Sequence, residues 1–332
     1  MNNFDIKGIK PYVASARSAI KLKTVFVSTD FIILEKPAGL LVHPVRRLNE
    51  GDLPTKENLL TEINGTLPGN NFSNGVHPDQ HHHEKTLIDL VLASYPEIET
   101  VGDHPPVGGR PGIVHRLDKD VSGLMVVARS QKFYEHIVQQ FTEDVATYGE
   151  AGRGSSGVRR SQSVNFIKNR EMSSAFSPRE EVEIQSAKAG RVKKEYLALV
   201  YGRPDPSAGR IDLPLARTKD GKIVAVQYHG KIKNQKEAVT EYETIKNYSQ
   251  YSLLKVRPLT GRTNQIRVHL RAINCPIVGD LIYGFKDKTE GDELGRIFLH
   301  AAYLGFYDLN NAWQEFRSDL PEVLVNFLNN LR

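Results

Sequence analysis

The sequence predicts an α+β protein in which strands outnumber short helices, and three observations support this class. Short apolar runs of the strand type recur along the chain, among them FIILEK at 31–36 and GLMVVA at 123–128. Two further runs, at 239–245 and 251–257, flank a short polar turn, which is typical of an antiparallel strand pair. Apolar residues at helical spacing are confined to short segments.

Composition narrows the class of protein. The chain has 332 residues, of which 39% are hydrophobic and 25% charged, as in soluble globular proteins. No apolar run reaches the roughly 18 residues of a transmembrane helix, and the first residues lack the apolar stretch of a secretory signal, so we expect a cytoplasmic protein without a membrane partner. A single cysteine, Cys275, excludes a disulfide framework and a cysteine-based zinc cluster, and we interpret it as a small buried hydrophobe. The net charge of +5 fits either a solvated basic surface or a polyanionic partner.

The first half of the chain shows two strands, two helices and a polar stretch. The strand at 31–36 is followed by Gly-, Asn- and Pro-rich residues 46–84, which we expect to form a loop insertion. Its three consecutive histidines, 81–83, have no partner at metal-ligand spacing, so an exposed loop is favoured over a metal site. Thr86 is expected to cap a helix in a capping box with Asp89. After the strand at 123–128, a helix capped by Ser130 is predicted from its apolar face, Phe133, Ile137, Val138 and Phe141.

The second half begins with an irregular stretch and then becomes regular. Residues 144–190 are rich in Gly, Ser and Arg and show no period, so a flexible insertion is predicted. A strand at 196–202, the strand pair, a helix at 262–273 and a last helix beginning near Pro321 follow. We expect one catalytic body at 25–332, interrupted by the insertions at 46–84 and 144–190 and preceded by an extension at 1–24.

Asp118 is the first candidate functional residue. It lies in a charged turn between an apolar pair and the strand at 123–128, where a side chain can be held rigidly at a sheet edge. The alternative is that Asp118 only caps the turn or pairs with Arg116 or Lys119. Asp118 and Asp120 do not form a convincing glycosidase pair, because those carboxylates flank the substrate about 5–9 Å apart.

Two further segments carry candidates. Tyr196 lies in a predicted strand, where it can stack on a base, transfer a proton or simply belong to the core. In the helix at 262–273, Arg262, Gln265 and His269 share one face, and Arg267 and Arg271 share another. Arginines near a helix start suit phosphate, and solvated charge is the alternative. The glycine-containing turn at 279–284 and the segment at 299–302 are interpreted as mainly architectural.

Six segments together resemble the RluA-type pseudouridine synthases. They are, in chain order, EKPAGLLVHP at 35–44, HRLDKDVSGL at 115–124, KEYLALVYG at 194–202, GRTNQIRVHL at 261–270, GDLIYG at 279–284 and LHAAYL at 299–304. The resemblance covers roughly residues 25–45, 85–143 and 191–308. Val121 stands where the family usually has threonine, and Asn264 where it usually has histidine, so we expect altered tuning rather than loss of activity. The residues before the first strand are too few for the S4 RNA-binding domain that many relatives carry.

The resemblance implies the fold, the reaction and the roles of the candidates. The fold would be a mixed, largely antiparallel sheet with flanking helices and a central RNA-binding cleft. The reaction would convert uridine in RNA, ribosomal RNA first and transfer RNA second, to pseudouridine without a cofactor or a metal. Asp118 would be the catalytic carboxylate, Arg267 its partner, and Tyr196 the residue that stacks on the uracil. Substrate contacts are expected from His115, Arg116, Arg262 and Gln265. A monomer is favoured.

Two other functions remain open at this point. A non-catalytic RNA-binding protein on the same fold would keep the basic cleft, although the presence of Asp118, Tyr196 and Arg267 argues against it. A glycoside hydrolase or nucleosidase that uses Asp118 would release a free base or sugar, whereas pseudouridine synthesis leaves the mass of the RNA unchanged.

Overall fold

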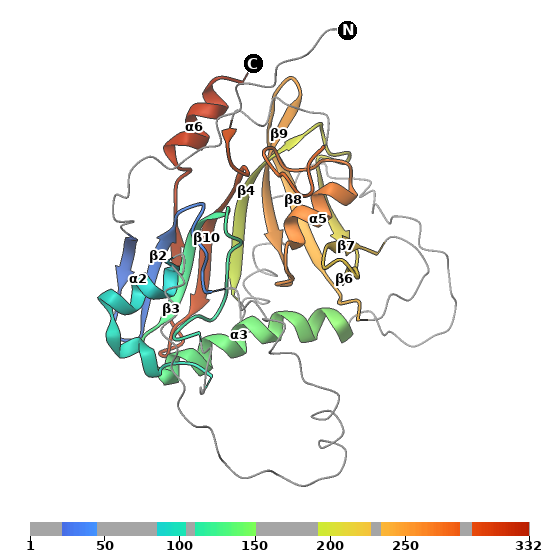
Figure 1. Ribbon diagram of the computed structural model, residues 1–332. Coiled ribbons are helices and arrows are strands. Elements are labelled where there is room, and N and C mark those ends of the chain that lie inside the picture. The colour runs from blue at the N-terminus through green and yellow to red at the C-terminus, as the bar shows by residue number, and fades with distance from the viewer. Residues whose placement is uncertain are drawn as a thin grey trace, which may run out of the picture.

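A computed structural model describes residues 22–44, 85–103, 110–150, 192–226, 234–285 and 294–331 (Figure 1). Its helices are α2 (Leu87–Ser94), the 3-10 helix η2 (Pro96–Thr100), α3 (Gln131–Glu150), α5 (Gln265–Ala272) and α6 (Glu322–Asn329). Its strands are β1 (Lys23–Val27), β2 (Phe31–Lys36), β3 (Ser122–Ala128), β4 (Lys193–Tyr201), β5 (Ala208–Asp212), β6 (Leu215–Arg217), β7 (Ile223–Ala225), β8 (Val239–Asn247), β9 (Tyr251–Pro258), β10 (Leu299–Tyr307) and β11 (Trp313–Arg317).

One large sheet forms the body of the described residues. Its nine strands run in the order β1-β2-β3-β10-β4-β9-β8-β5, with β11 paired to β10, and β6 and β7 form a separate ribbon. The β3–β10 pair is parallel and all other pairs of the large sheet are antiparallel. This mixed sheet with flanking helices confirms the predicted α+β class.

The apolar strands are explained by packing on both faces of the sheet. Successive side chains of a strand point to opposite faces, so Phe31 and Ile33 join a different cluster from Ile32 and Leu34. Phe31 stacks on Phe133 of α3, with ring centroids 4.8 Å apart. The apolar residues of α2 pack in the cluster on the opposite face. Because helices cover both faces, the first four residues of β2, FIIL, are all apolar instead of alternating.

The parallel β3–β10 pair is short, so most of this edge of β3 is left for the segment that carries the candidate functional residues. The two strands pair only at Ser122 and Gly123, where the chains approach so closely that a Cβ on Gly123 would collide with the backbone of Ala301. Further along β3, its free edge is taken by the segment before Asp118, and the carbonyl of Gly112 accepts from the amide of Ala128 at 2.9 Å. The segment that leads to Asp118 therefore runs along the edge of β3, where the amide of Val126 donates to His115.

Several predicted elements are confirmed in detail. The backbone amide of Thr86 donates to the Asp89 carboxylate at 2.8 Å, and the Thr86 hydroxyl accepts a hydrogen bond from the backbone amide of Asp89. These two bonds form the expected capping box. Cys275 is buried, as predicted. The helix predicted at 262–273 begins only at Gln265, because Asn264 has the left-handed φ of 54°. Asparagine is one of the few residues that adopt this conformation readily.

The second predicted insertion needs a correction. α3 continues to Glu150, so residues 144–150 belong to this helix and not to the insertion. The rest of that insertion, the insertion at 46–84 with its three histidines, and the extension through residue 21 lie outside the described residues. No helix in the described part of the chain has the length and apolar character to cross a bilayer.

His300 predicts how stability depends on pH. It is 1% exposed, its Nδ1 lies 2.9 Å from the Ser122 hydroxyl and its Nε2 lies 3.1 Å from the Ser318 hydroxyl. Burial lowers the pKa of His300 to about 4, while an unfolded histidine titrates near pH 6.5. Between these values the unfolded chain binds more protons, so the stabilisation is complete above about pH 6.5 and is lost as the pH falls toward 4.

We therefore expect the free energy of unfolding in urea to fall between pH 7 and pH 4.5, and the fall to be smaller in a His300→Gln variant. The variant removes the titrating group but retains a polar side chain at this position. Equal pH slopes in the two proteins would contradict the account of His300.

Candidate active site

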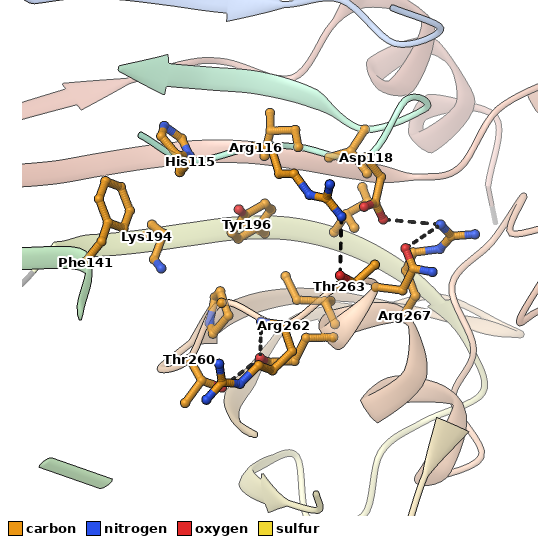
Figure 2. A pocket seen from close by; sticks show the side chains of 18 of the residues that line it. His115, Arg116, Asp118, Phe141, Lys194, Tyr196, Thr260, Arg262, Thr263 and Arg267 are labelled. Carbon is orange, nitrogen blue, oxygen red and sulfur yellow. Dashed lines mark hydrogen bonds and ion pairs between the residues drawn. The ribbon is translucent and has the colours of Figure 1, made fainter. Parts of the chain in front are cut away.

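The predicted site residues surround one cavity of about 370 Å³ (Figure 2). Its walls come from the segment 113–118, from β4 and from the loop that leads into α5. Five cationic side chains line it, and Asp118 is the one carboxylate among the described residues that do so. The cations are Arg110, Arg116, Lys194, Arg262 and Arg267. This excess of positive charge favours a polyanion over an ordinary solvated surface.

Asp118 is held by a short turn and by Arg267. The carbonyl oxygen of Asp118 accepts the amide of Val121 at 3.2 Å, which closes the turn directly before β3. Its carboxylate Oδ2 accepts from Arg267 Nη1, also at 3.2 Å. The Asp118 side chain is 26% exposed, so the carboxylate is paired without being sealed from the cavity. The predicted pairing of Asp118 with Arg267 is confirmed.

Arg267 is itself fixed by Asp280, a residue that the sequence analysis missed. Arg267 Nε donates to Asp280 Oδ2 at 2.7 Å and Nη2 donates to Oδ1 at 2.8 Å, in the bidentate geometry of strong ion pairs. The Asp280 side chain has no exposed surface. Burial alone would lower the pKa of Arg267, but the hydrogen bonds and charges of Asp280 and Asp118 outweigh it and raise the pKa. The guanidinium therefore stays charged, with one nitrogen aimed at Asp118.

The turn at 279–284 thus does more than was predicted for it. Asp280 Oδ1 also accepts the backbone amides of Ile282 and Tyr283, each at 2.9 Å, so one carboxylate shapes the turn and orients Arg267. The Tyr283 ring lies 5.1 Å from the Arg267 guanidinium carbon. The signal in the sequence was a lone carboxylate in an otherwise apolar and glycine-rich segment.

Asn264 supplies a second contact to the Asp118 carboxylate. With its nitrogen toward Asp118, the Asn264 amide donates to Oδ2 at 2.9 Å and accepts from the Tyr283 hydroxyl at 3.1 Å. A neutral donor therefore occupies the place where the resemblance leads one to expect histidine.

Tyr196 lies in the cavity wall between Asp118 and Lys194 (Figure 2). Burial raises the pKa of the Tyr196 hydroxyl above its usual range, and the negative charge of Asp118 raises it further. Tyr196 therefore keeps its proton while Asp118 is ionised, and presents a neutral ring and a hydrogen-bond donor to a ligand.

Two of the predicted substrate-binding arginines reach from opposite walls. Arg116 is exposed, and its Nη2 donates to the Thr263 hydroxyl at 3.3 Å, a bond that joins the two walls in Figure 2. Arg262 is anchored through Nε to the carbonyl of Glu237 at 2.9 Å. Both leave guanidinium nitrogens for an RNA backbone.

Gln265 is placed differently from its predicted role as a substrate contact. It is 4% exposed and its amide is fully used within the protein. Its nitrogen donates to the Val239 carbonyl and the Thr240 hydroxyl, and its oxygen accepts from the Thr260 hydroxyl and the Arg262 amide, at 2.7–3.0 Å. With no hydrogen-bonding capacity left, Gln265 supports the wall from behind, and a direct contact with substrate does not follow from this geometry.

Lys36 is a second residue that the sequence analysis did not single out. It is 1% exposed, and its ammonium donates to the carbonyls of Pro37, Leu40 and Lys119, each at 2.8 Å. Because Lys119 follows Asp118 directly, Lys36 ties the turn at 37–40 to the turn that carries Asp118. Within the described ranges, no three His, Cys, Asp or Glu side chains lie together as metal ligands do.

Comparison of the sequence with known proteins finds a family that matches it and several relatives. The family described as RNA pseudouridylate synthase matches residues 30–147 and 169–272. An uncharacterized RNA pseudouridine synthase of Chloroflexus aurantiacus is 36% identical over 259 residues, which are 77% of this chain and 63% of the relative's length. One of Aquifex aeolicus is 30% identical and covers 92% of this chain and 71% of its own. The ribosomal large subunit pseudouridine synthase D of Borreliella burgdorferi is 28% identical, with coverages of 94% and 69%.

A solved structure supports the fold. Human RNA Pseudouridylate Synthase Domain Containing 1 matches with a TM-score of 0.54 at 21% identity, over 91% of this chain and 84% of that one. The family match extends over more than half of the chain, and it confirms the resemblance predicted from the six motifs. The chain belongs to the RNA pseudouridylate synthase family, in its RluA type.

Proposed function

We propose that this protein isomerises a uridine in ribosomal RNA to pseudouridine, with Asp118 as the catalytic carboxylate. The observation that carries the proposal is Asp118, the one carboxylate that the described residues bring to the cationic cavity, oriented by Arg267, which Asp280 fixes in turn. The relatives named as ribosomal large subunit pseudouridine synthases support ribosomal RNA as the substrate.

The reaction needs no redox partner, since its bonds balance within one nucleotide. The N1–C1′ bond breaks, the uracil turns, and a C5–C1′ bond forms while C5 loses its proton and N1 gains one. Asp118 can begin this sequence by attacking C1′ or by removing the C2′ proton to give a glycal, and either route requires the ionised carboxylate. The Arg267 guanidinium orients this carboxylate through its hydrogen bond to Oδ2.

Tyr196 and the cations fit the remaining steps. The target base has to leave its stack, which costs a few kcal/mol. The Tyr196 ring offers the uracil a new stacking partner, and phosphate contacts from Arg116 and Arg262 offset the cost. If Asp118 becomes an ester at C1′, its charge disappears, and with it one of the two causes that raise the Tyr196 pKa. Loss of that charge makes the Tyr196 hydroxyl easier to deprotonate, and only the deprotonated oxygen can accept the C5 proton.

The proposal is tested by release of tritium from RNA labelled at uridine C5, because only formation of the C5–C1′ bond displaces that hydrogen. Unmodified ribosomal and transfer RNA transcripts are compared in parallel. Release from ribosomal RNA alone is the expected result. Release from transfer RNA alone would overturn the choice of substrate, and no release from either would contradict the proposed reaction.

A further inference from the structure

The cavity continues past Tyr196, away from Asp118, into a region with no role in the reaction described above. His115, Phe141 and Lys194 lie at this end, while Asp118 and Arg267 lie at the other (Figure 2). Residues two apart in a strand lie about 6.6 Å apart on one face, which separates Lys194 from Tyr196. A uracil on Tyr196 therefore leaves Lys194 facing a neighbouring nucleotide.

His115 presents a fixed hydrogen-bond donor at this end. Its Nε2 lies 3.0 Å from the backbone nitrogen of Val126 in β3, which can only donate, so Nε2 is the acceptor and Nδ1 carries the proton. Burial, and next the charge of Lys194, lower the pKa of His115 to about 3, so the ring is neutral. No described residue accepts a hydrogen bond from Nδ1.

Phe141 keeps the two polar groups in place. Its ring stacks on His115, with centroids 5.1 Å apart and an angle of 25° between the planes. The Lys194 ammonium lies 5.2 Å from the centre of the Phe141 ring, within the range of a cation–π interaction. The side chains gathered here are thus a cation and a neutral N–H donor.

We propose that His115 and Lys194 form a subsite for the phosphodiester of a nucleotide next to the target uridine. A phosphate oxygen accepts hydrogen bonds and carries negative charge, which matches a pair made of one ammonium and one N–H donor. The subsite rests on the proposed function for its orientation, since the uracil at Tyr196 defines which phosphate is the neighbour. It would hold the RNA in register and leave the chemistry to Asp118.

Lys193 and Lys194 offer a matched pair for the test. They are consecutive in β4 and so point to opposite faces, and each lies over an aromatic ring, Lys193 over Trp313 at 5.8 Å and Lys194 over Phe141. We expect Lys194→Met to raise KM about tenfold with kcat nearly unchanged, because a contact equal in the ground and transition states affects binding alone. Lys194→Arg should restore most of the loss, and Lys193→Met should behave like the wild type.

The phosphate itself is identified with a series of oligonucleotides that contain the uridine that the enzyme converts. In each oligonucleotide, one phosphodiester next to this uridine is replaced by an uncharged methylphosphonate. For the wild type and for Lys193→Met, the methylphosphonate at one of these linkages should lower kcat/KM about tenfold relative to the unsubstituted oligonucleotide. For Lys194→Met, the same methylphosphonate should cause no additional decrease, because the contact is already absent. Losses that multiply at every linkage, or equal effects of the two methionine variants, would overturn the subsite.

RNA binding without turnover keeps this test separate from that of the proposed function. Lys194→Met should lower the slope of log affinity against log salt by about one, and Lys193→Met should leave it unchanged. An enzyme that modifies RNA but shows no such difference would refute the subsite alone. A protein that shows the difference but forms no pseudouridine would refute the proposed function alone.

Discussion

Asp118→Asn is expected to reduce turnover by at least about a thousandfold, because the amide can neither attack C1′ nor accept the C2′ proton. The replacement has the same shape, and the Asp118 side chain is 26% exposed, so the free energy of unfolding should change by no more than about 1 kcal/mol. RNA affinity should remain close to that of the wild type, since the phosphate contacts come from other residues. Tritium release, urea unfolding and RNA binding are measured on one preparation.

The same variant tests the alternative roles of Asp118. If Asp118 only caps its turn, the variant should lose stability and activity together. A loss of several kcal/mol in the free energy of unfolding, or a turnover within tenfold of the wild type, would contradict a catalytic role.

Arg267→Met is expected to have the second largest effect, on both activity and stability. Asp118 loses the guanidinium that orients it, which should cost about 10²–10³ in kcat. Asp280, whose side chain is fully buried, loses the partner of two hydrogen bonds. A buried charge left without its partner destabilises a protein by about 3–5 kcal/mol.

The double variant Arg267→Met with Asp280→Asn separates the two effects. An amide at position 280 still offers an oxygen to the backbone amides of Ile282 and Tyr283, and no buried charge remains. Stability should therefore recover in large part while activity stays low. Recovery of activity along with stability would show that Arg267 serves the fold and does not serve the Asp118 carboxylate.

Strands and helix ends could be predicted from the sequence where a single local factor, such as burial on both faces or a capping contact, determines them. A strand covered on both faces needs a continuous apolar run, so the runs FIIL of β2 and GLMVVA of β3 were recognisable without knowledge of their neighbours. The capping box at Thr86 depends only on residues three apart. Residues 144–150 were assigned to the insertion together with the Gly-, Ser- and Arg-rich stretch, although that composition begins only at Ala151.

The site was predicted where motifs name its residues, and missed where only the fold joins them. Asp118 and Arg267 lie 149 positions apart, and their pairing followed from the family resemblance and not from spacing. Asp280 and Lys36 act through contacts with distant residues and backbone carbonyls, which no local pattern encodes. Helical spacing placed Gln265 and His269 on one face, but could not show that this face packs on β8 through Thr240.

The central claim is that the Asp118 cavity isomerises a uridine, and nucleoside analysis of treated RNA tests it most directly. RNA incubated with the wild type or with Asp118→Asn is digested to nucleosides. These are separated by chromatography and their masses are measured by mass spectrometry. The account predicts that wild-type protein alone yields a nucleoside with the mass of uridine and the retention of pseudouridine, with no free uracil. Free uracil would instead identify a nucleosidase, and unchanged uridine in RNA that the protein binds would identify a binding protein on a synthase fold.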